Sequence, residues 1–215
     1  MKTLIKEDLE KNLLIYGCGG HARSLADVAL SNGHRHILFI DENAKPNEQL
    51  FGFHLIKSLD HYHDLPLNEK ANTILALGDN HKRAELFDQL VQTHQMISIV
   101  SNKAHWGINA SIAPGVFVGH GAHIGPNATI GTNTIINTHA VIEHDCQIGQ
   151  HSHIAVNTTI AGGCRIGDFV MIGAGATVID GISVCSHVTI GAGAVVIKDI
   201  TEPGTYVGIP AQKIG

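Results

Sequence analysis

Hydrophobic residues in the second half of the chain recur with a period of six. Every sixth position from Ile112 to Val196 is Ile or Val, for fifteen consecutive positions without an insertion. A small or β-branched residue usually stands four places after each of them, and Gly often follows directly. This pattern predicts a coil with three short flat sides, in which the branched residues point inward and the corners take small residues. At about 4.8 Å between stacked strands, about five coils would form a prism about 24 Å tall.

A parallel sheet of Ile- and Val-rich strands is the main alternative for these residues. Strands of such a sheet are joined by crossover helices of about ten residues or more. Repeats of six leave no room for them, so we expect a parallel β-helix of hexapeptide repeats over about residues 112–201.

The first half has a different pattern, with buried strands alternating with amphipathic helices. A strand at 13–16 precedes a glycine turn and a helix to Gly33, and a second strand spans 37–40. A strand at 74–77 leads through a Gly-Asp-Asn loop into a helix over about 82–93. We therefore expect a small Rossmann-like α/β domain in residues 1–101 and the β-helix domain with its C-terminal tail in residues 102–215.

The first glycine turn has the spacing of a phosphate-binding loop. Gly17, Gly19 and Ala22 fit the pattern GxGxxA, and Asp41 ends the next strand, where it could reach a ribose hydroxyl. A nicotinamide dehydrogenase would use the same fingerprint, and a turn without any ligand also fits it. Because about 100 residues hold only one such unit, we favour a nucleotide-linked substrate over NAD.

Charge separates the two halves and limits the classes of partner. Residues 1–101 carry 23 charged side chains and residues 102–215 carry 10, while the whole chain has 14 Lys and Arg against 19 Asp and Glu. No basic stretch favours nucleic acid, and no apolar stretch is long enough to predict a membrane span or signal core. We expect a cytoplasmic protein whose four cysteines are reduced.

His144 is the best candidate for a general base. It stands between Glu143 and Asp145, either of which could hold one ring nitrogen and leave the other free to accept a proton. Residues one coil apart should stack, which places Gly162 over His144 with its amide available to a developing oxyanion. Cys146 falls on a small-residue core position, so we interpret it as core filling rather than as a nucleophile.

The 16 histidines raise the question of a metal site. Only His105 and His123 share a column in adjacent coils, and a metal site would need at least three ligands in register. We therefore assign no metal.

The whole chain resembles a known family, the trimeric sugar-nucleotide acetyltransferases that include bacillosamine N-acetyltransferase (PglD), perosamine N-acetyltransferase and the NeuD type of sialic acid O-acetyltransferase. The resemblance rests on YGCGGHA, on ALGDN with the nearby Arg83, and on three later motifs, IINTHAVIEHDCQIG, HSHIAVN and VGIPAQK. It implies a Rossmann-like domain followed by a left-handed parallel β-helix.

The resemblance also implies a homotrimer with acetyl-CoA bound between neighbouring prisms and a nucleotide sugar held by the small domain. His144 matches the catalytic base, and Asp145 lies where bacillosamine-type enzymes tend to have Glu. The positions expected near acetyl-CoA are His153, Gly162, Ala174, Ala192, Ile209 and Pro210. The positions expected near the acceptor sugar nucleotide are Gly17, Gly19, Gly20, His21, Asp41, Glu42, Asn80, Arg83 and Asn137.

The sequence thus predicts an acetyl-CoA-dependent acetyltransferase that uses direct attack on the thioester. We expect its acceptor to be the 4-amino group of a UDP-4-amino-4,6-dideoxy sugar, made for surface polysaccharide, nonulosonate or protein glycosylation. O-acetylation of sialic acid or a related nonulosonate, and N-acetylation of GDP-perosamine, remain alternatives. Two further hypotheses are a zinc-dependent carbonic anhydrase on a similar prism and a binding protein without catalysis.

Overall fold

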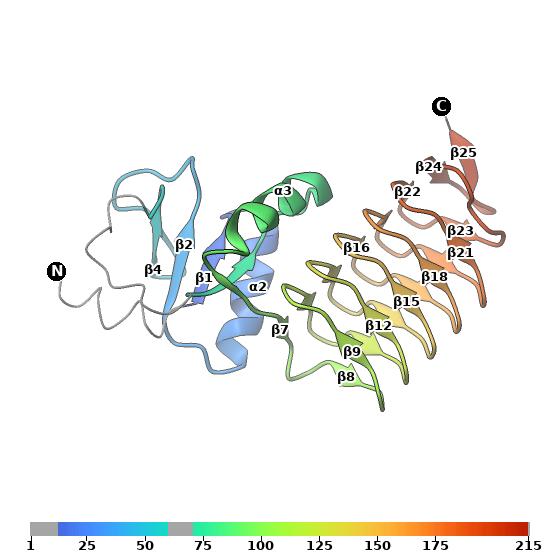
Figure 1. The fold of residues 1–215 in the computed structure, drawn as a ribbon, viewed down its shortest axis with the longest axis horizontal. Helices are drawn as coiled ribbons and strands as arrows, with labels where there is room; N and C mark the ends of the chain where they lie inside the picture. The colour runs from blue at the N-terminus through green and yellow to red at the C-terminus, as the bar shows by residue number, and fades with distance from the viewer. Residues whose placement is uncertain (1–12, 60–70, 215) are drawn as a thin grey trace.

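The small domain is built on a mostly parallel sheet. The computed structural model describes residues 13–59 and 71–214, so the N-terminal residues assessed for a signal core lie outside the described residues. Strands β1 (Leu13–Tyr16), β2 (Ile37–Ile40), β4 (Phe53–Ile56), β5 (Asn72–Leu75) and β6 (Gln95–Met96) pair in parallel in the order β4-β2-β1-β5-β6. The short strand β3 (Gln49–Leu50) adds an antiparallel edge. Helix α2 (Gly20–Ser31) follows β1, and α3 (Asn80–Leu90) follows β5 (Figure 1).

The rest of the chain winds into a parallel β-helix with three faces (Figure 1). The first face contains β7 (Ile99–Val100), β10 (Phe117–Val118), β13 (Ile135–Ile136), β16 (His153–Ile154), β19 (Met171–Ile172), β22 (Val188–Ile190) and the terminal β24 (Gly204–Val207) and β25 (Gln212–Ile214). The second face contains β8 (His105–Trp106), β11 (His123–Ile124), β14 (Val141–Ile142), β17 (Thr159–Ile160), β20 (Thr177–Val178) and β23 (Val195–Val196). The third face contains β9 (Ser111–Ile112), β12 (Thr129–Ile130), β15 (Gln147–Ile148), β18 (Arg165–Ile166) and β21 (Ser183–Val184).

Hydrogen-bonded strand pairs have the register that the six-residue period predicts. Val141 lies beside His123 and Thr159, one coil away on either side. In the two-residue strands from β10 to β21 the second residue is a buried Ile or Val, so a column of Ile and Val fills the prism together with small residues such as Ala128 and Cys146. Burial of this continuous apolar column is the main source of stability for strands only two residues long.

The small domain packs on the first face of the prism. Ile99, Phe117 and Ile135 point outward from that face, and each is at most 2% exposed because it packs into the core of the small domain. Leu25 of α2 belongs to the same core. The two domains therefore share one hydrophobic core, and β16 is the first strand of this face beyond that apolar contact.

The sequence predicted most elements, with local differences. The β-helix ladder begins at Ile99, earlier than the expected start near Ile112 and within the range expected for the small domain. Helix α3 begins at Asn80, where Asp79 caps it by accepting from the amides of His81 and Lys82. Within the described residues, no helix combines the length and apolar character that crossing a bilayer requires.

Candidate active site

The edge between the second and third faces carries His144, and we call it the His144 edge. The Nδ1 atom of His144 lies 2.8 Å from Oδ2 of Asp145, and both side chains are more than half exposed. Because a carboxylate only accepts, Nδ1 carries the proton and donates, which leaves Nε2 with its lone pair. Glu143 instead accepts from the backbone amide of His144, so Asp145 is the orienting carboxylate.

Electrostatics at this edge favour a basic imidazole. The hydrogen bond to Asp145 raises the pKa of His144 above its ordinary value, and the negative charges of nearby carboxylates add to this. Hydrogen bonds from His144 and Asn127 in turn lower the pKa of Asp145, so its carboxylate stays ionised at neutral pH. The pair can take up one proton at Nε2 without losing its own hydrogen bond.

Gly162 lies in contact with the His144 ring, as the stacking rule predicted. A Cβ atom on Gly162 would come within 2.5 Å of Cε1 and Nε2 of His144, so only glycine leaves room for the imidazole in this position. The Gly162 amide donates to no carbonyl among the described residues, which leaves it available to a ligand. A base and a free amide are therefore adjacent on one edge.

Cys146 follows this pair but points into the prism. Its side chain is fully buried and donates to the carbonyl of Ala161 at 3.1 Å. A hydrogen bond with Cys164 and burial both raise its pKa, so the thiol is a poor nucleophile.

Two other histidines meet where the domains join, and we call His21, Gly78, Asn137 and His153 the domain junction. His153 lies on β16 with Nδ1 3.4 Å from the carbonyl oxygen of Gly78 and Nε2 3.4 Å from the amide nitrogen of Asn137. The ring of His21 is centred 6.3 Å from that of His153. Both nitrogens of His21 are buried without a hydrogen-bond partner among the described residues, so the junction has unused polar atoms.

Burial keeps both junction histidines neutral. Burial, with a smaller contribution from the charge of Arg83, lowers the pKa of His21 to about 3 and that of His153 to about 4. Neither ring is an imidazolium at neutral pH, so neither acts as a general acid, but each has one N–H donor and one acceptor nitrogen for a neutral polar group.

The glycine turn is closed by Asp41. Its Oδ2 accepts from the amide of Cys18 at 3.1 Å, and its Oδ1 accepts from the amide of Asn43 at 2.9 Å. Gly17 has φ of 109°, and a side chain there would press on the carbonyl of Ala76. Asp41 thus holds the loop, whereas Gly19 and Gly20 have open space where a side chain would stand. Glu42 belongs to the turn after β2 and makes no contact that joins it to this loop within the described residues.

Arg83 and Asn80 were expected to contact the substrate, and the structure gives them a different place. Arg83 is 1% exposed, and its guanidinium donates to backbone carbonyls of both domains: Leu77, Gly78, Asn133, His151 and Ser152. Asn80 accepts from Arg83 and donates to the carbonyl of Val170. Because their polar atoms are already engaged, these two residues fix the Gly78 loop against the prism, and a direct substrate contact does not fit this arrangement.

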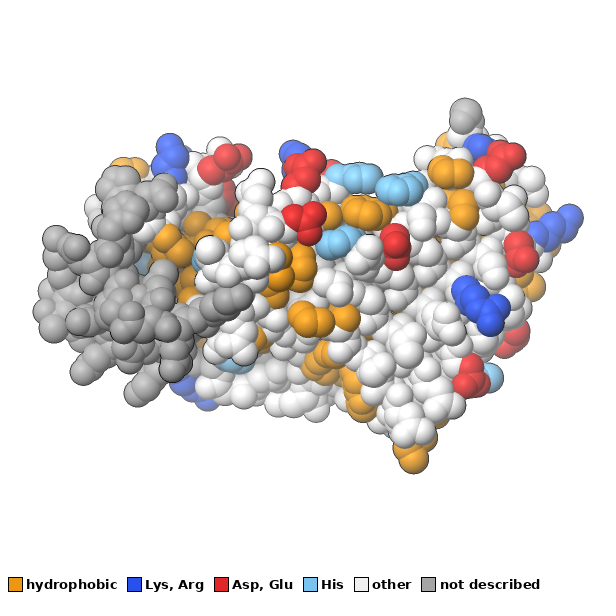
Figure 2. All heavy atoms as spheres, viewed as in Figure 1, with side chains coloured by type: hydrophobic (Ala, Val, Ile, Leu, Met, Phe, Trp, Pro, Cys, Tyr) orange, Lys and Arg blue, Asp and Glu red, His pale blue; other side chains and the backbone are white. Residues whose placement is uncertain are grey.

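An aromatic stack beside Arg83 was not foreseen. His151, Phe169 and His187 stack along the edge between the third and first faces, and His81 of α3 stacks on Phe169 with ring centres 5.0 Å apart. Figure 2 shows histidine and hydrophobic side chains together on the upper surface of the prism. The 18-residue spacing of the three prism residues was the signal that could have revealed this stack.

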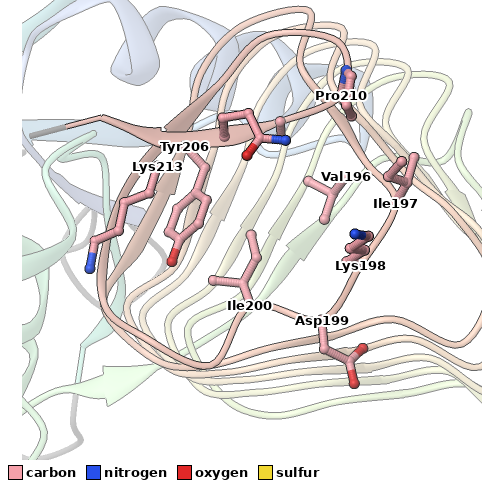
Figure 3. Close-up of a pocket in the computed structure, with 10 residues that line it drawn as sticks. Val196, Ile197, Lys198, Asp199, Ile200, Tyr206, Pro210 and Lys213 are labelled. Carbon is pink, nitrogen blue, oxygen red and sulfur yellow. The ribbon is translucent and has the colours of Figure 1, made fainter.

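Two of the residues expected near acetyl-CoA, Ala174 and Ala192, lie on the edge between the first and second faces. Ala174 and Ala192 stack there with exposed side chains, and the amide of Gly193 donates to the carbonyl of Ala174. Ile209 is 77% exposed beside a tail that pairs with Val195. Pro210 lines a cavity of about 290 Å³ at the end of the prism, together with Lys198, Tyr206 and Lys213 (Figure 3).

The candidate residues therefore form two groups within one chain. His144, Asp145 and Gly162 lie on one edge of the second face. Asn137, Ala174 and Ala192 lie on its other edge, next to the domain junction. The chain does not bring the two groups together on its own. Within the described residues, no three His, Cys, Asp or Glu side chains are grouped in a way that could hold a metal ion.

Family models match both domains. Residues 12–90 match the PglD N-terminal domain, and residues 109–143 and 163–198 match the bacterial transferase hexapeptide of six repeats. A comparison with curated protein sequences found no match.

Solved structures resemble the chain over nearly its full length. The acetyltransferase domain of PglB from Neisseria gonorrhoeae is 28% identical, with a TM-score of 0.89 over 95% of this chain and 100% of that one, and it is also known in complex with acetyl coenzyme A. PerB from Caulobacter crescentus, in complex with CoA and GDP-perosamine, is 27% identical, with a TM-score of 0.86 over 95% of this chain and 97% of that one. WeeI from Acinetobacter baumannii shares the fold at 19% identity and a TM-score of 0.65, over 94% of this chain and 99% of that one. With a PglD-type domain joined to a left-handed β-helix of hexapeptide repeats, the chain belongs to the sugar acetyltransferase family of the PglD type.

Proposed function

We propose that the protein transfers acetyl from acetyl-CoA to the 4-amino group of a UDP-4-amino-4,6-dideoxy sugar, with His144 as the general base. The observation that carries this proposal is the contact of His144 with Asp145 on one side and Gly162 on the other. It provides an unprotonated Nε2 and a free amide within one small region. These are the two groups that acyl transfer to an amine requires.

The arrangement supports direct transfer without an acyl-enzyme. Nε2 of His144 accepts the proton that the acceptor amine loses as its nitrogen attacks the thioester carbonyl. The Gly162 amide donates to the oxygen on which negative charge develops, and His144 then returns the proton to the departing thiolate. Asp145 stabilises the imidazolium while it holds the proton. Cys146 takes no part because its thiol is buried.

We further propose that the active site is shared between subunits of a homotrimer. The His144 edge of one subunit would meet the edge with Asn137, Ala174 and Ala192 of the next, so each contact joins two different surfaces. Such contacts can close into a ring. The acceptor would then approach His144 from the domain junction of the neighbouring subunit.

From Val141 onward, beyond the stacked pair His105 and His123, the second face is less polar than the third, which supports this arrangement. Val141, Thr159 and Val195 point outward from the second face, whereas Gln147 and Arg165 point outward from the third. Exposed Ile108, Ile179 and Ile197 follow the His144 edge and extend the apolar surface. These apolar side chains are exposed to water in a single chain. Burying them between subunits would be favourable because it removes apolar surface from water.

A nucleotide sugar also fits the small domain better than NAD does. The two oxygens of Asp41 already accept hydrogen bonds that close the loop, so this carboxylate is not positioned as a free ribose ligand. Gly19 and Gly20 have open space where a phosphate could approach the loop, and the buried nitrogens of His21 beside it still lack a hydrogen-bond partner among the described residues. The exposed small residues Ala174 and Ala192, with Ile209 and Pro210 above them, would line pantetheine and adenine.

Turnover with a panel of acceptors tests this function. The protein is incubated with acetyl-CoA and each of a UDP-4-amino-4,6-dideoxy sugar, GDP-perosamine and a sialic acid, and thiol release and acetylated product are measured together. We expect the highest kcat/KM with the UDP sugar and acetate on nitrogen. Transfer only to GDP-perosamine would change the nucleotide, and transfer only to a sialic acid hydroxyl would establish the O-acetyltransferase alternative. Binding of NAD without any transfer would refute the proposal.

A further inference from the structure

A file of three residues runs down the His144 edge below the proposed base. Asn109, Asn127 and Asp145 occupy the same corner position in successive coils, with φ of 58°, 58° and 60°. Nδ2 of Asn109 lies 3.3 Å from Oδ1 of Asn127, and Nδ2 of Asn127 lies 3.0 Å from Oδ1 of Asp145. The file ends where Oδ2 of Asp145 meets His144.

The direction of each hydrogen bond in this file is determined. An ionised carboxylate can only accept, so Asn127 must turn its amide NH₂ toward Asp145 and its carbonyl oxygen toward Asn109. Asn109 then donates to that oxygen. With one oxygen of Asp145 held by Asn127, the other stays aimed at Nδ1 of His144. The proton of the imidazole is thereby kept on Nδ1, and the lone pair is kept on Nε2.

We infer that Asn127 is a positioning residue for catalysis, which acts through Asp145 to keep His144 in its reactive tautomer. This inference rests on the proposed function, in which Nε2 of His144 is the base. The inference adds Asn127, which lies one coil below His144. None of the glycine or histidine motifs in the sequence had pointed to this residue. Asn127 itself would touch neither substrate.

A purely conformational role for Asn127 makes a different prediction. Asparagine and glycine both tolerate the left-handed backbone of this corner, so the side chain could be present for its φ alone. The backbone ladder, in which the amide of Asn127 donates to the carbonyl of Ile108, would then be all that matters. Asn127→Gly allows the same left-handed backbone and removes the side chain with its amide group.

The first test is steady-state kinetics of Asn127→Gly, with Asn109→Gly as the matched control on the same corner. We expect kcat of Asn127→Gly to fall about tenfold, the lower end of what is lost with an outer-shell partner, while KM for both substrates stays within about twofold. Asn109→Gly leaves the contact between Asn127 and Asp145 intact, so its kcat should change less than about twofold. Equal kcat for wild type and Asn127→Gly would overturn the inference, and so would equal losses in the two variants.

The second test reads the tautomer directly and does not depend on the acceptor. In protein labelled with ¹⁵N on histidine, the His144 signals, identified by their loss in His144→Ala, should show Nδ1–H in the wild type at alkaline pH. They should show a mixture of tautomers in Asn127→Gly. Unchanged signals would refute the role of Asn127 even if no acetyl acceptor were found, whereas changed signals with an inactive wild type would leave Asn127 in place and remove the proposed function.

Asn127→Asp covers the case in which the glycine variant is unstable. It keeps the shape and the backbone preference but replaces the donor with a carboxylate that faces Asp145. We expect kcat at neutral pH to fall about tenfold in this variant too, because the ionised side chain cannot donate to Asp145. Full activity of Asn127→Asp would overturn the inference.

Discussion

His144 and His153 stand nine residues apart on one prism and have opposite surroundings. His144 is exposed, and its hydrogen bond with Asp145 raises its pKa, while burial at the domain junction lowers the pKa of His153 to about 4. One imidazole is prepared to take up a proton, and the other is prevented from doing so. The comparison shows that the fold separates the basic imidazole of the His144 edge from the neutral imidazole of the domain junction. In the proposed trimer, proton transfer and acceptor binding would therefore be carried out by different subunits.

Of the substitutions we predict, one on the His144 edge should reduce turnover the most. His144→Ala removes the proposed base, so we expect kcat to fall at least about a hundredfold, the scale of general-base catalysis. The proposed trimer should remain, because the side chain is more than half exposed and lies outside the core. Sedimentation velocity checks the assembly, and Gln147→Ala, exposed on the third face of the same coil, is the control that should keep full turnover. Wild-type turnover in His144→Ala would exclude His144 from the mechanism.

Mixing two variants tests whether the His144 edge and the domain junction of different subunits form one site, provided that His153→Ala, like His144→Ala, loses most of its turnover. His144→Ala and His153→Ala are unfolded together and refolded at equal amounts, so that subunits assort at random. If each site takes His144 from one subunit and His153 from the next, about a quarter of the sites in the mixture regain both residues. We expect turnover to recover to about that fraction of wild type. A mixture no more active than its components would place both residues in one subunit's site or separate their roles.

The contact between Gly162 and His144 can be broken without replacing His144 or Asp145, the two side chains proposed to be catalytic. Gly162→Ala places a methyl group within 2.5 Å of the imidazole atoms, so the ring must swing aside while the backbone, which has no positive φ here, is unstrained. We expect kcat to fall about tenfold, with thermal stability close to that of the wild type. In the double variant with His144→Ala, the alanine at 162 should add almost nothing, because both changes act on the same group. Additive losses would show that Gly162 acts independently of the imidazole.

The sequence predicted the prism well because its rule is simple. A fixed period forces stacking, so the contact between His144 and Gly162 could be derived from an 18-residue interval alone. The place of Arg83 could not be derived, because its partners are backbone carbonyls on two domains whose relative position depends on the packing of Ile99, Phe117 and Ile135. A charged residue near a glycine loop looks like a ligand for phosphate until that packing is known. The role of Asn127 was hidden for a related reason, since asparagine at a left-handed corner is expected with or without a hydrogen bond.

The domain junction should make the folded protein less stable at low pH, because its histidines have lowered pKa values. The raised pKa of His144 acts in the opposite direction. His21 and His153 have folded-state pKa values of about 3 and about 4, whereas an unfolded histidine titrates near 6.5. A lowered pKa means that the unfolded chain binds protons which the folded chain does not. The stabilisation is therefore full above pH 6.5 and is lost as pH falls toward 4.

This loss of stability at low pH is the smallest effect we predict. A histidine variant separates it from the destabilisation caused by protonation of carboxylates. Between pH 7 and pH 5 the Tm of the wild type should fall by several degrees, since about 1 kcal/mol corresponds to roughly 2–4 °C in a chain of this size. His21→Leu keeps an apolar side chain against Phe117 and removes one titrating ring. His153 and the other histidines whose pKa burial lowers, His34, His94 and His151, remain, so the Tm of the variant should fall by fewer degrees than that of the wild type over the same range. Calorimetry at several pH values measures both slopes. If the Tm of the wild type and of His21→Leu falls by the same amount, His21 is charged or solvated in the folded protein. The contrast between the His144 edge and the domain junction would then rest on His153 alone.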